Sequence, residues 1–283
     1  MKDIDDLIPD IHALFRAPHE CDKERVKTFG SDLAETIERR LSEVRGPNYL
    51  RMSNLGKGDR QLYYDMNGGD DDPEVLSPST KIKFLFGDIL ELMLIFLAEE
   101  AGHTVDDKQK KVEVNGIVGS IDCTIDGVLV DCKSASTYAF KKFKDGTLPE
   151  NDSFGYMEQL AGYSKGLGGR DGAFFAIDKT LGHIVLDRHS SGELSKYKIE
   201  DRIDHLKTVV VSPALPERCH SPESDGKSGN TVLSINCSYC RHKFECWKDV
   251  NNGIGLRTFL YSTGPKHFVE VIREPNGPKE ITF

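Results

Sequence analysis

The segment at residues 119–133, GSIDCTIDGVLVDCK, holds two aspartates whose spacing could support chemistry. Asp126-Gly127 is a strong signal for a two-residue hairpin turn. Counting outward from that turn places Asp122 directly opposite Asp131, with Cβ atoms about 4.5–5.5 Å apart. Two like charges in this position destabilise a hairpin, and a divalent cation between them reverses that effect because hard cations prefer carboxylate oxygens. The spacing therefore predicts a metal-binding carboxylate pair.

Lys133 adds an ammonium group to this pair. It lies two residues after Asp131, so both side chains project from one face of the strand, while Cys123 and Cys132 point to the opposite, core side. Metal-assisted phosphodiester hydrolysis needs this set: a metal polarises the phosphate and lowers the pKa of a bound water, and a lysine positions that water or stabilises developing charge. The alternative is an ordinary exposed strand face with an Asp–Lys pair, since D-x-K tripeptides are common.

The surrounding sequence predicts the elements that must position these side chains. The expected strands are residues 111–114, 117–125, 128–134, 173–178, 183–187 and 267–272. The expected helices are residues 23–44, 81–101 with Thr80 as its cap, 154–167 closed by Gly168-Gly169, and 195–209. A loop is expected between residues 135 and 153. The order of helix, three strands, helix and strand predicts an α/β arrangement with a mixed sheet.

The 283-residue chain carries 37 Lys and Arg against 46 Asp and Glu, a net charge of −9. This charge counts against a protein that coats nucleic acid, which would be basic, but it allows an enzyme that holds DNA in one local groove. No apolar run approaches the length needed to span a bilayer. The first residues, MKDIDDLIPDIHALF, are acidic where a secretory signal would carry Lys or Arg. We therefore expect a cytoplasmic protein with no membrane segment.

Four short motifs together resemble one known family. Gly119-Ser120-Ile121-Asp122 and Asp131-Cys132-Lys133 look like the two central motifs of RecB-type nucleases of the PD-(D/E)xK superfamily, which are related to CRISPR-associated and phage exonucleases. Upstream, FLFGDILELML resembles the family's helix, in which a Gly is followed four residues later by a His or Glu. Downstream, a Q-x3-Y signature matches. The residues of these two flanking motifs are Gly87, Glu91, Gln159 and Tyr163.

The resemblance covers roughly residues 51–180 and implies a restriction-endonuclease-like core with a central mixed β-sheet flanked by helices. It also implies a site for Mg²⁺ or Mn²⁺ whose ligands are Asp122, Asp131 and the carbonyl of Cys132. Glu91 would complete that site, although many relatives carry a His there, and Asp88 is the competing carboxylate on the same helix. Lys133 would be the catalytic lysine. Gln159 and Tyr163 would shape the site or touch DNA, Tyr163 being equally well a core aromatic.

The implied function is metal-dependent exonuclease activity on DNA, in recombination, repair or a phage setting. Two alternatives stay open: a structure-specific endonuclease on the same fold, and a non-catalytic nucleic-acid-binding module with a zinc knuckle. A homo-oligomer or contact with recombination or replication proteins is compatible with the family. Residues 53–64, SNLGKGDRQLYY, resemble a stretch ahead of the core of related exonucleases, so Ser53, Lys57 and Arg60 are candidate DNA contacts, Arg60 by bidentate hydrogen bonding or, alternatively, a surface salt bridge.

Other candidate phosphate contacts occur in groups, each of which could also be a solvated face. They are Arg39, Arg40, Arg45 and Arg51; Lys108, Lys110 and Lys111; and Lys141, Lys142 and Lys144. By composition we expect an N-terminal helical and DNA-contact region at residues 1–80, a nuclease core at 81–212, and a Cys-rich metal-binding segment with a tail at 213–283.

Four cysteines crowd the C-terminal part with the spacing Cys219-x17-Cys237-x2-Cys240-x5-Cys246. A C-x2-C pair with two further cysteines nearby is a strong metal signal, the alternative being buried reduced thiols. Several relatives hold a [4Fe-4S] cluster through three such C-terminal cysteines and a fourth upstream, where this sequence has Gly58. Cys219 can supply the missing thiolate, and structural Zn²⁺ suits the set at least as well as iron–sulfur. His220 and His242 are substitute ligands, and Trp247 is expected to pack against this loop.

Overall fold

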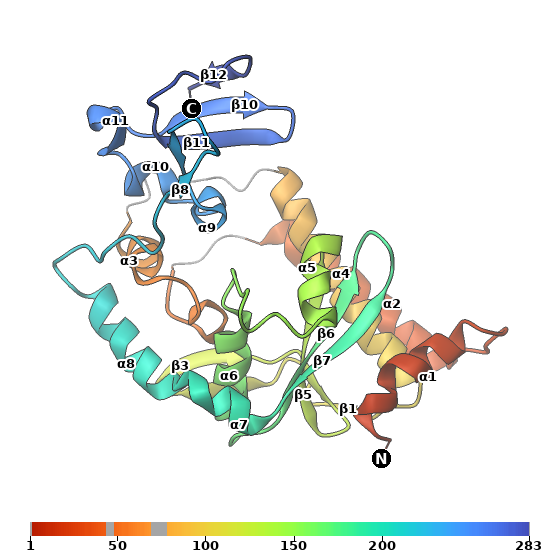
Figure 1. Cartoon of the computed structure of the whole chain (residues 1–283). Coiled ribbons are helices and arrows are strands. Elements are labelled where there is room, and N and C mark those ends of the chain that lie inside the picture. Colours follow the sequence, from red (N-terminus) through yellow and green to blue (C-terminus); the bar gives the residue numbers. More distant parts are fainter. Residues whose placement is uncertain (1, 44–47, 69–77, 283) are drawn as a thin grey trace. The chain divides into compact units, whose positions relative to one another are not determined.

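The computed structural model describes residues 2–43, 48–68 and 78–282 (Figure 1). The chain divides into two compact units, and each is described by itself. The larger unit comprises Met1–Lys57 and Val75–Lys207, and the smaller unit comprises Gly58–Glu74 and Thr208–Phe283. This division differs from the expected boundaries at residues 80 and 212, because the N-terminal helices belong to the same unit as the core. Arg45 and most of the acidic stretch at residues 68–80 lie outside the described residues.

The larger unit is a mixed α/β structure. Its central sheet has five strands in the order β1-β4-β5-β6-β7, with β5 and β6 parallel and the other neighbours antiparallel. The strands are β1 (Val105–Asp106), β4 (Cys123–Ile125), β5 (Val128–Ala135), β6 (Gly172–Asp178) and β7 (Ile184–His189), and a separate hairpin is formed by β2 (Lys111–Val114) and β3 (Ile117–Ser120). The expected mixed sheet is therefore confirmed.

Helices cover both faces of this sheet. They are α1 (Leu7–Leu14), α2 (Lys23–Ser42), α4 (Pro78–Glu100), α5 (Thr137–Lys144), α6 (Tyr156–Gly166), α7 (Ser191–Leu194) and α8 (Ile199–Val210), with 3-10 turns η1 (Ile4–Asp6), η2 (Met52–Asn54) and η3 (Ser195–Tyr197). α1 and α4 pack on one face through a buried cluster that includes Leu94, Val130 and Phe175. Helices α5 and α6 contact the strands as well, and Phe143 of α5 meets Phe174 of β6 at 5.5 Å between ring centroids.

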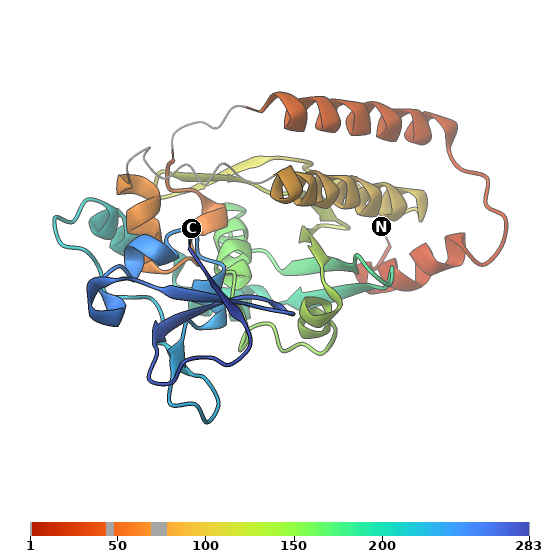
Figure 2. The ribbon, with the colours of Figure 1, turned by 90° about the horizontal axis from the view of Figure 1, so that it is seen from above.

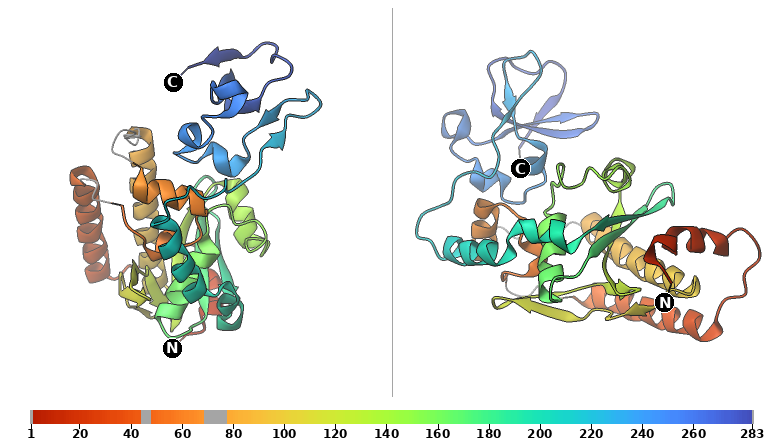
Figure 3. Two further views of the ribbon diagram at one scale, coloured as in Figure 1. Left: turned by 90° about the vertical axis from the view of Figure 1, so that its left-hand side faces the viewer. Right: turned by 60° about the horizontal axis from the view of Figure 1, so that its bottom comes forward.

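Helix α2 lies alongside α4 and carries polar side chains over most of its surface. Figure 2 and Figure 3 show the two helices side by side, and Phe29 contacts Phe96 with ring centroids 5.1 Å apart. Thr36 is its single fully buried residue among the twenty of the helix. Ion pairs and this one ring contact therefore hold α2, with little buried apolar surface to add to them.

Four details of the larger unit differ from expectation. Thr80 lies inside α4, which begins by Pro78, so it is not the cap. The strand expected at 117–125 is interrupted at Ile121 and Asp122, which separates β3 from β4. Residues 137–144 form α5 where a loop was expected. The helix expected from residue 195 begins as η3 and continues as α8 only after Lys198, whose φ of +45° breaks the helical path.

The smaller unit contains a second five-stranded antiparallel sheet, in the order β12-β10-β11-β9-β8, of which the sequence predicted a single strand. Its elements are α3 (Asp59–Asn67), β8 (Glu223–Ser224), β9 (Thr231–Val232), α9 (Ile235–Ser238), α10 (Lys243–Cys246), α11 (Val250–Gly253), β10 (Arg257–Tyr261), β11 (Gly264–Glu270) and β12 (Lys279–Ile281). Trp247 packs with Leu233, Cys237 and Val269 on this sheet, as expected. Among the described residues, no helix combines the length and apolar character needed to cross a bilayer.

Candidate metal-dependent active site

The turn at Asp126-Gly127 sets the geometry of the candidate site. Both residues have positive φ, +48° and +84°, as a tight two-residue hairpin turn requires. Cys123 pairs with Val130 across the hairpin, and the strand pairing ends there, one position short of Asp122 and Asp131. In place of a further backbone pair, the Asp122 side chain bonds to β5: its Oδ2 accepts a 2.7 Å hydrogen bond from the Cys132 backbone N–H. Asp122 therefore lies beside β5 and next to the segment that carries Asp131, and the direct facing of the two carboxylates stays a prediction.

Lys133 lies on the same face of β5 as Asp131. Its ammonium forms an ion pair with Asp131 Oδ2, and the two side chains are 16% and 2% exposed. The Nζ also lies 4.7 Å from the centroid of the Tyr156 ring and donates a long hydrogen bond, 3.5 Å, to Gln159 Oε1. A buried cation is thus surrounded by a carboxylate, an aromatic face and an amide oxygen, all of which stabilise its charge.

The two residues of the Q-x3-Y motif lie one turn apart on α6 and belong to the same network. Gln159 Nε2 donates to the Tyr163 hydroxyl at 3.2 Å, while its Oε1 accepts from Lys133. Tyr163 is 4% exposed, and burial raises the pKa of its phenol to about 12. Gln159 therefore links Tyr163 to the lysine, and the phenol remains protonated at neutral pH.

Glu91 approaches the carboxylate pair from α4. Gly87, one turn earlier, faces the same strand: a Cβ there would lie 3.7 Å from the Ser134 hydroxyl of β5. Asp88, the competing carboxylate, is bound by Arg40 at 2.5 and 2.8 Å and by Arg39 at 3.1 Å. The ion pairs of Asp88 leave Glu91 as the α4 carboxylate that faces the hairpin.

Gln109 is a site residue that the sequence did not reveal. Its Nε2 donates to Glu91 Oε1 at 2.9 Å, and its backbone N–H donates to the Asp122 carbonyl at 3.0 Å. Gln109 also has a φ of +53°, which is unusual for a residue other than glycine. No motif marks this position, because its two partners are 13 and 18 residues away in the chain.

Burial and mutual repulsion dominate the electrostatics of these carboxylates. Burial is the main cause that raises the pKa of Glu91, the nearby carboxylates of Asp131 and Asp88 raise it further, and it reaches about 7. Burial, then Asp131 and Glu91, raises the pKa of Asp122 well above its ordinary value. Burial alone would lower the pKa of Lys133, but the two aspartates outweigh it and hold the pKa above its usual value. The site therefore favours positive charge and disfavours a second or third negative charge.

A divalent cation fits this donor set. Oxygen ligands are what Mg²⁺ and Mn²⁺ prefer, and a cation would offset the repulsion that raises the carboxylate pKa values. The oxygens of Glu91, Asp122 and Asp131 are not all within 4.8 Å of one another; among the described residues, the trio that meets this spacing is His19, Cys21 and Glu100. Side-chain rotation would have to draw the three carboxylates together around an ion.

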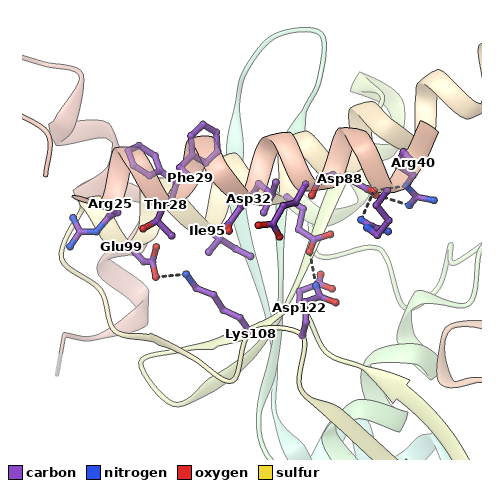
Figure 4. Close-up of a pocket in the computed structure, with 17 residues that line it drawn as sticks. Arg25, Thr28, Phe29, Asp32, Arg40, Asp88, Ile95, Glu99, Lys108 and Asp122 are labelled. Atoms are coloured by element: carbon purple, nitrogen blue, oxygen red, sulfur yellow. Dashed lines mark hydrogen bonds and ion pairs between the residues drawn. The ribbon is translucent and has the colours of Figure 1, made fainter. Parts of the chain in front are cut away.

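A pocket of about 810 Å³ lies between α2 and α4 and reaches Glu91, Gln109 and Asp122 (Figure 4). Its cations are paired: Figure 4 shows Arg40 directed to Asp88 and Lys108 directed to Glu99. Its other lining residues include the carboxylates Asp32 and Glu35. This side of the site is therefore acidic, which suits the entry of a cation better than the approach of a phosphate chain.

The four C-terminal cysteines lie on short helices and turns of the smaller unit. Burial raises the pKa of Cys237, Cys246 and Cys240, the last to about 11, and the thiolates raise one another's pKa further. Cys219 occupies the space that a side chain at Gly58 would fill, because a Cβ built on Gly58 would overlap its Sγ. Gly58 and the Cys219 side chain are thus in direct contact.

The donor set of these thiols suits a thiophilic metal. No three of the four sulfurs lie mutually within 4.8 Å among the described residues. Zn–S bonds of about 2.3 Å would require sulfurs roughly 3.8 Å apart. A single zinc ion therefore needs the side chains to close in, whereas a cluster whose irons each bind one thiolate spans a wider set. His242 is engaged elsewhere, with its Nε2 2.8 Å from Asp65 Oδ1.

Arg60 lies beside this cysteine segment. Its guanidinium donates to the carbonyls of Pro216 at 3.3 Å and Cys246 at 3.4 Å, and it packs over the Tyr64 ring at 5.8 Å. Arg218 donates to the same Cys246 carbonyl at 3.1 and 3.2 Å. These contacts order the segment around Cys246, and a DNA contact by Arg60 stays a prediction.

The other predicted DNA contacts differ in their surroundings. Ser53 is exposed on η2, and the carbonyl of Lys57 accepts a 2.6 Å bond from Arg202. Lys110 pairs with Asp107 at 3.0 Å. Lys141 and Lys144 are exposed on α5.

Comparisons with known proteins give likeness in structure only. No protein-family model matches the chain, and no curated protein matches it. The solved protein SSO0001 is 18% identical, with a TM-score of 0.38 over 76% of this chain and 94% of that one. The alkaline exonuclease LHK-Exo from Laribacter hongkongensis is 15% identical, with a TM-score of 0.37 over 62% and 94%. A phage-related exonuclease from Haemophilus somnus is 12% identical, with a TM-score of 0.37 over 58% and 94%.

Proposed function

We propose that this chain is a metal-dependent deoxyribonuclease of the PD-(D/E)xK type that hydrolyses phosphodiester bonds, as an exonuclease acting from DNA ends. The observation that carries the proposal is the burial of Asp122 close enough to Asp131 for the two to repel each other, with the Lys133 ammonium paired to Asp131 on the same face of β5. Burying two like charges together costs free energy, and an ordinary strand face gains nothing in return. A site that binds a cation at the two carboxylates, and a phosphate beside them, offsets that cost.

In the proposed mechanism, Glu91, Asp122, Asp131 and the Cys132 carbonyl would hold Mg²⁺ or Mn²⁺. When bound, the ion supplies Lewis-acid polarisation of the phosphate and a water of lowered pKa. Lys133 stays protonated because neighbouring carboxylates raise its pKa. Its N–H groups can therefore donate to the attacking water or to a phosphate oxygen, and they stabilise the charge that develops there.

The remaining residues fix the lysine. Asp131 and Gln159 accept from its ammonium and restrict its rotamers. Tyr163 in turn fixes Gln159, because its hydroxyl accepts from the amide. We infer that Gln159 and Tyr163 act through Lys133 and do not themselves transfer a proton.

A non-catalytic nucleic-acid-binding module is the second candidate. The acidic pair argues against it, since two carboxylates facing a phosphate weaken binding by Coulomb repulsion unless a cation lies between them. An endonuclease on the same fold would use the same site, and substrate topology separates the two activities.

The test uses end-labelled linear DNA and closed circular DNA, each with Mg²⁺, Mn²⁺ or EDTA. We expect metal-dependent loss of the linear substrate alone, and none with Lys133→Ala. Cutting of the circle would indicate an endonuclease. Full activity of Lys133→Ala would contradict the site assignment, and DNA binding without cleavage under every condition would favour the binding module.

For the smaller unit we propose a structural metal centre held by Cys219, Cys237, Cys240 and Cys246, either zinc or a [4Fe-4S] cluster. The support is the concentration of four thiols in one small unit and the placement of Cys219 against Gly58. A metal there would link segments that are otherwise short helices and turns.

A further inference from the structure

Three aromatic rings form a stack that begins at the protein surface. Phe154 stacks on Tyr156 with centroids 5.5 Å apart and planes 29° apart, and Tyr156 stacks on Phe143 at 6.2 Å and 27°. The outermost ring, Phe154, is 57% exposed, whereas Phe143 is 3% exposed. The stack therefore has a buried base and an outer ring with an open apolar surface.

The stack also reaches the catalytic lysine. Tyr156 contacts Phe154 on one hand and lies 4.7 Å from Lys133 Nζ on the other. A phosphate held at Lys133 would place the sugar and base of its own nucleotide within reach of these rings. Aromatic side chains beside a phosphate site are what proteins use to stack unpaired bases.

The loop that carries Phe154 is fixed despite its exposure. Asp152 Oδ1 accepts the backbone N–H groups of Phe154 and Gly155 at 3.0 and 2.9 Å, and its Oδ2 accepts that of Met157 at 2.8 Å. Gly155 adopts a φ of +74°, which makes it the natural residue to turn the chain into α6. A rigid exposed aromatic loses little conformational entropy when a ligand stacks on it.

The charges around the stack favour a phosphate chain on this side of the site. Phe143 lies on α5, whose Lys141 and Lys144 are exposed, and Lys142 reaches across to the Asn151 carbonyl at 2.7 Å, which joins α5 to the Phe154 loop. The pocket between α2 and α4, by contrast, is acidic and its cations are already paired. Although Asp145 and Glu150 of the same segment are exposed too, the lysines of α5 offer a phosphate chain cations that the α2–α4 pocket does not.

We propose that Phe154, supported from behind by Tyr156, stacks on an unpaired nucleobase of the DNA strand whose phosphate lies at Lys133. This inference rests on the proposed nuclease function and adds a substrate class to it: strands whose bases are unpaired at the point of cleavage. A base within an intact duplex cannot lie on the stack without leaving its partner, and that separation costs free energy in the duplex but not in a single strand.

The first experiment measures binding without cleavage. Short single strands carrying the fluorescent base 2-aminopurine are titrated with protein in EDTA, using wild type, Phe154→Ala, Phe154→Trp and Phe15→Ala. Phe15 is a matched control, since it is 72% exposed elsewhere in the same unit. We expect stacking to quench the fluorescence, Phe154→Ala to weaken binding roughly tenfold, Phe154→Trp to retain it, and Phe15→Ala to leave it unchanged.

The second experiment measures cleavage of single-stranded and blunt duplex DNA with Mg²⁺. We expect Phe154→Ala to raise KM for single strands with kcat nearly unchanged, because the lysine and carboxylates are untouched. If wild type cleaves DNA and Phe154→Ala binds and cleaves like wild type, the stacking site is overturned and the nuclease assignment stands. If wild type cleaves nothing, the nuclease assignment fails. The fluorescence titration then decides by itself: loss of quenching in Phe154→Ala supports stacking, and unchanged quenching contradicts it.

Discussion

The chain contains two concentrations of potential metal ligands that are built in different ways. In the larger unit, oxygen donors come near one another because a tight hairpin brings the segments of Asp122 and Asp131 together and a helix adds Glu91. In the smaller unit, sulfur donors come from short helices and turns at Cys219, Cys237, Cys240 and Cys246. The first set lies on a scaffold of paired strands and packed helices, whereas the second has little regular structure of its own.

This difference predicts opposite consequences of metal loss. The oxygen set is held in place by the sheet, so the fold persists without metal and retains the repulsion of its carboxylates. The thiol set lies among short elements with two small apolar clusters, so a metal there contributes to folding itself. The carboxylate site should therefore lower the free energy of unfolding when no cation is bound. The thiol site should raise the free energy of unfolding of the smaller unit when a metal is bound.

The largest effect is expected at the thiols. Cys237→Ser removes one of four ligands, and we expect loss of bound metal and of several kcal/mol of stability in the smaller unit. Metal analysis, visible absorbance for iron–sulfur and proteolysis of the smaller unit measure it. Ser221→Ala is the control, because Ser221 is exposed in the same smaller unit and outside this set. If Cys237→Ser keeps its metal content and its resistance to protease, the four thiols are ordinary core residues that do not bind a metal.

The next largest effect is expected at Asp122, where one substitution should lower activity and raise stability. Asp122→Asn should lower cleavage at least ~100-fold, because the site loses a charge that holds the cation. The same substitution should raise the thermal stability of metal-free protein, since the pKa of Asp122 is raised by burial, Asp131 and Glu91, and an amide oxygen can still accept from Cys132.

Activity and melting temperature in EDTA provide the measurement for this pair of effects, with Asp201→Asn, an exposed residue of α8, as the control. A stabilised but fully active Asp122→Asn protein would remove Asp122 from the metal site. A destabilised protein would mean that its charge is compensated in the native fold.

The hairpin that brings Asp122 near Asp131 could be predicted from sequence because its geometry is local. A two-residue turn and the period of two along a strand fix which side chains face each other, and Lys133 follows from the same period. Gln109 was missed because its contacts to Glu91 and Asp122 depend on how α4 meets the hairpin. Helix α5 was missed because its lysines and short length resemble a loop, although Ser136 caps it and Phe140 and Phe143 form its buried face.

The sheet of the smaller unit could not be predicted for a related reason. β8 and β9 have two residues each, too few to show a period, and β9 pairs with β11 across more than thirty positions. The hairpin of β10 and β11 turns at Ser262-Thr263, which lacks the Asn-Gly or Asp-Gly signal that marked the turn at Asp126. Strands that pair across long sequence separations, joined by turns without a marked residue pair, leave no local pattern in the sequence.

A smaller effect follows from the pKa of Glu91, which burial, Asp131 and Asp88 raise from 4.5 to about 7. Between these values the folded protein binds more protons than the unfolded chain, so the free energy of unfolding in EDTA should fall as pH rises from 4.5 to 7. Glu91→Gln should flatten this part of the profile. Saturating Mg²⁺ should oppose the fall, because it binds the deprotonated site. Denaturant unfolding across this window tests it, and an unchanged slope in Glu91→Gln would place the responsible protons elsewhere.

The smallest effect tests whether the carboxylates must be positioned by a further side chain as well as by the sheet. Gln109→Ala removes the 2.9 Å hydrogen bond to Glu91 Oε1, and a neutral bond of this kind contributes about 1 kcal/mol. Because Glu91 is ionised when Mg²⁺ is bound, the bond is stronger than a neutral one, and we expect the Mg²⁺ concentration for half-maximal cleavage to rise roughly tenfold, with little change in KM for DNA. Asn115→Ala is the matched control: Asn115 also has a positive φ, +46° against +53° for Gln109, but bonds to Asp204 instead of the carboxylates. Equal responses of the two variants would attribute the change to backbone strain. A shift in Mg²⁺ dependence confined to Gln109→Ala would show that the carboxylates, unlike the thiols, are positioned before the metal arrives.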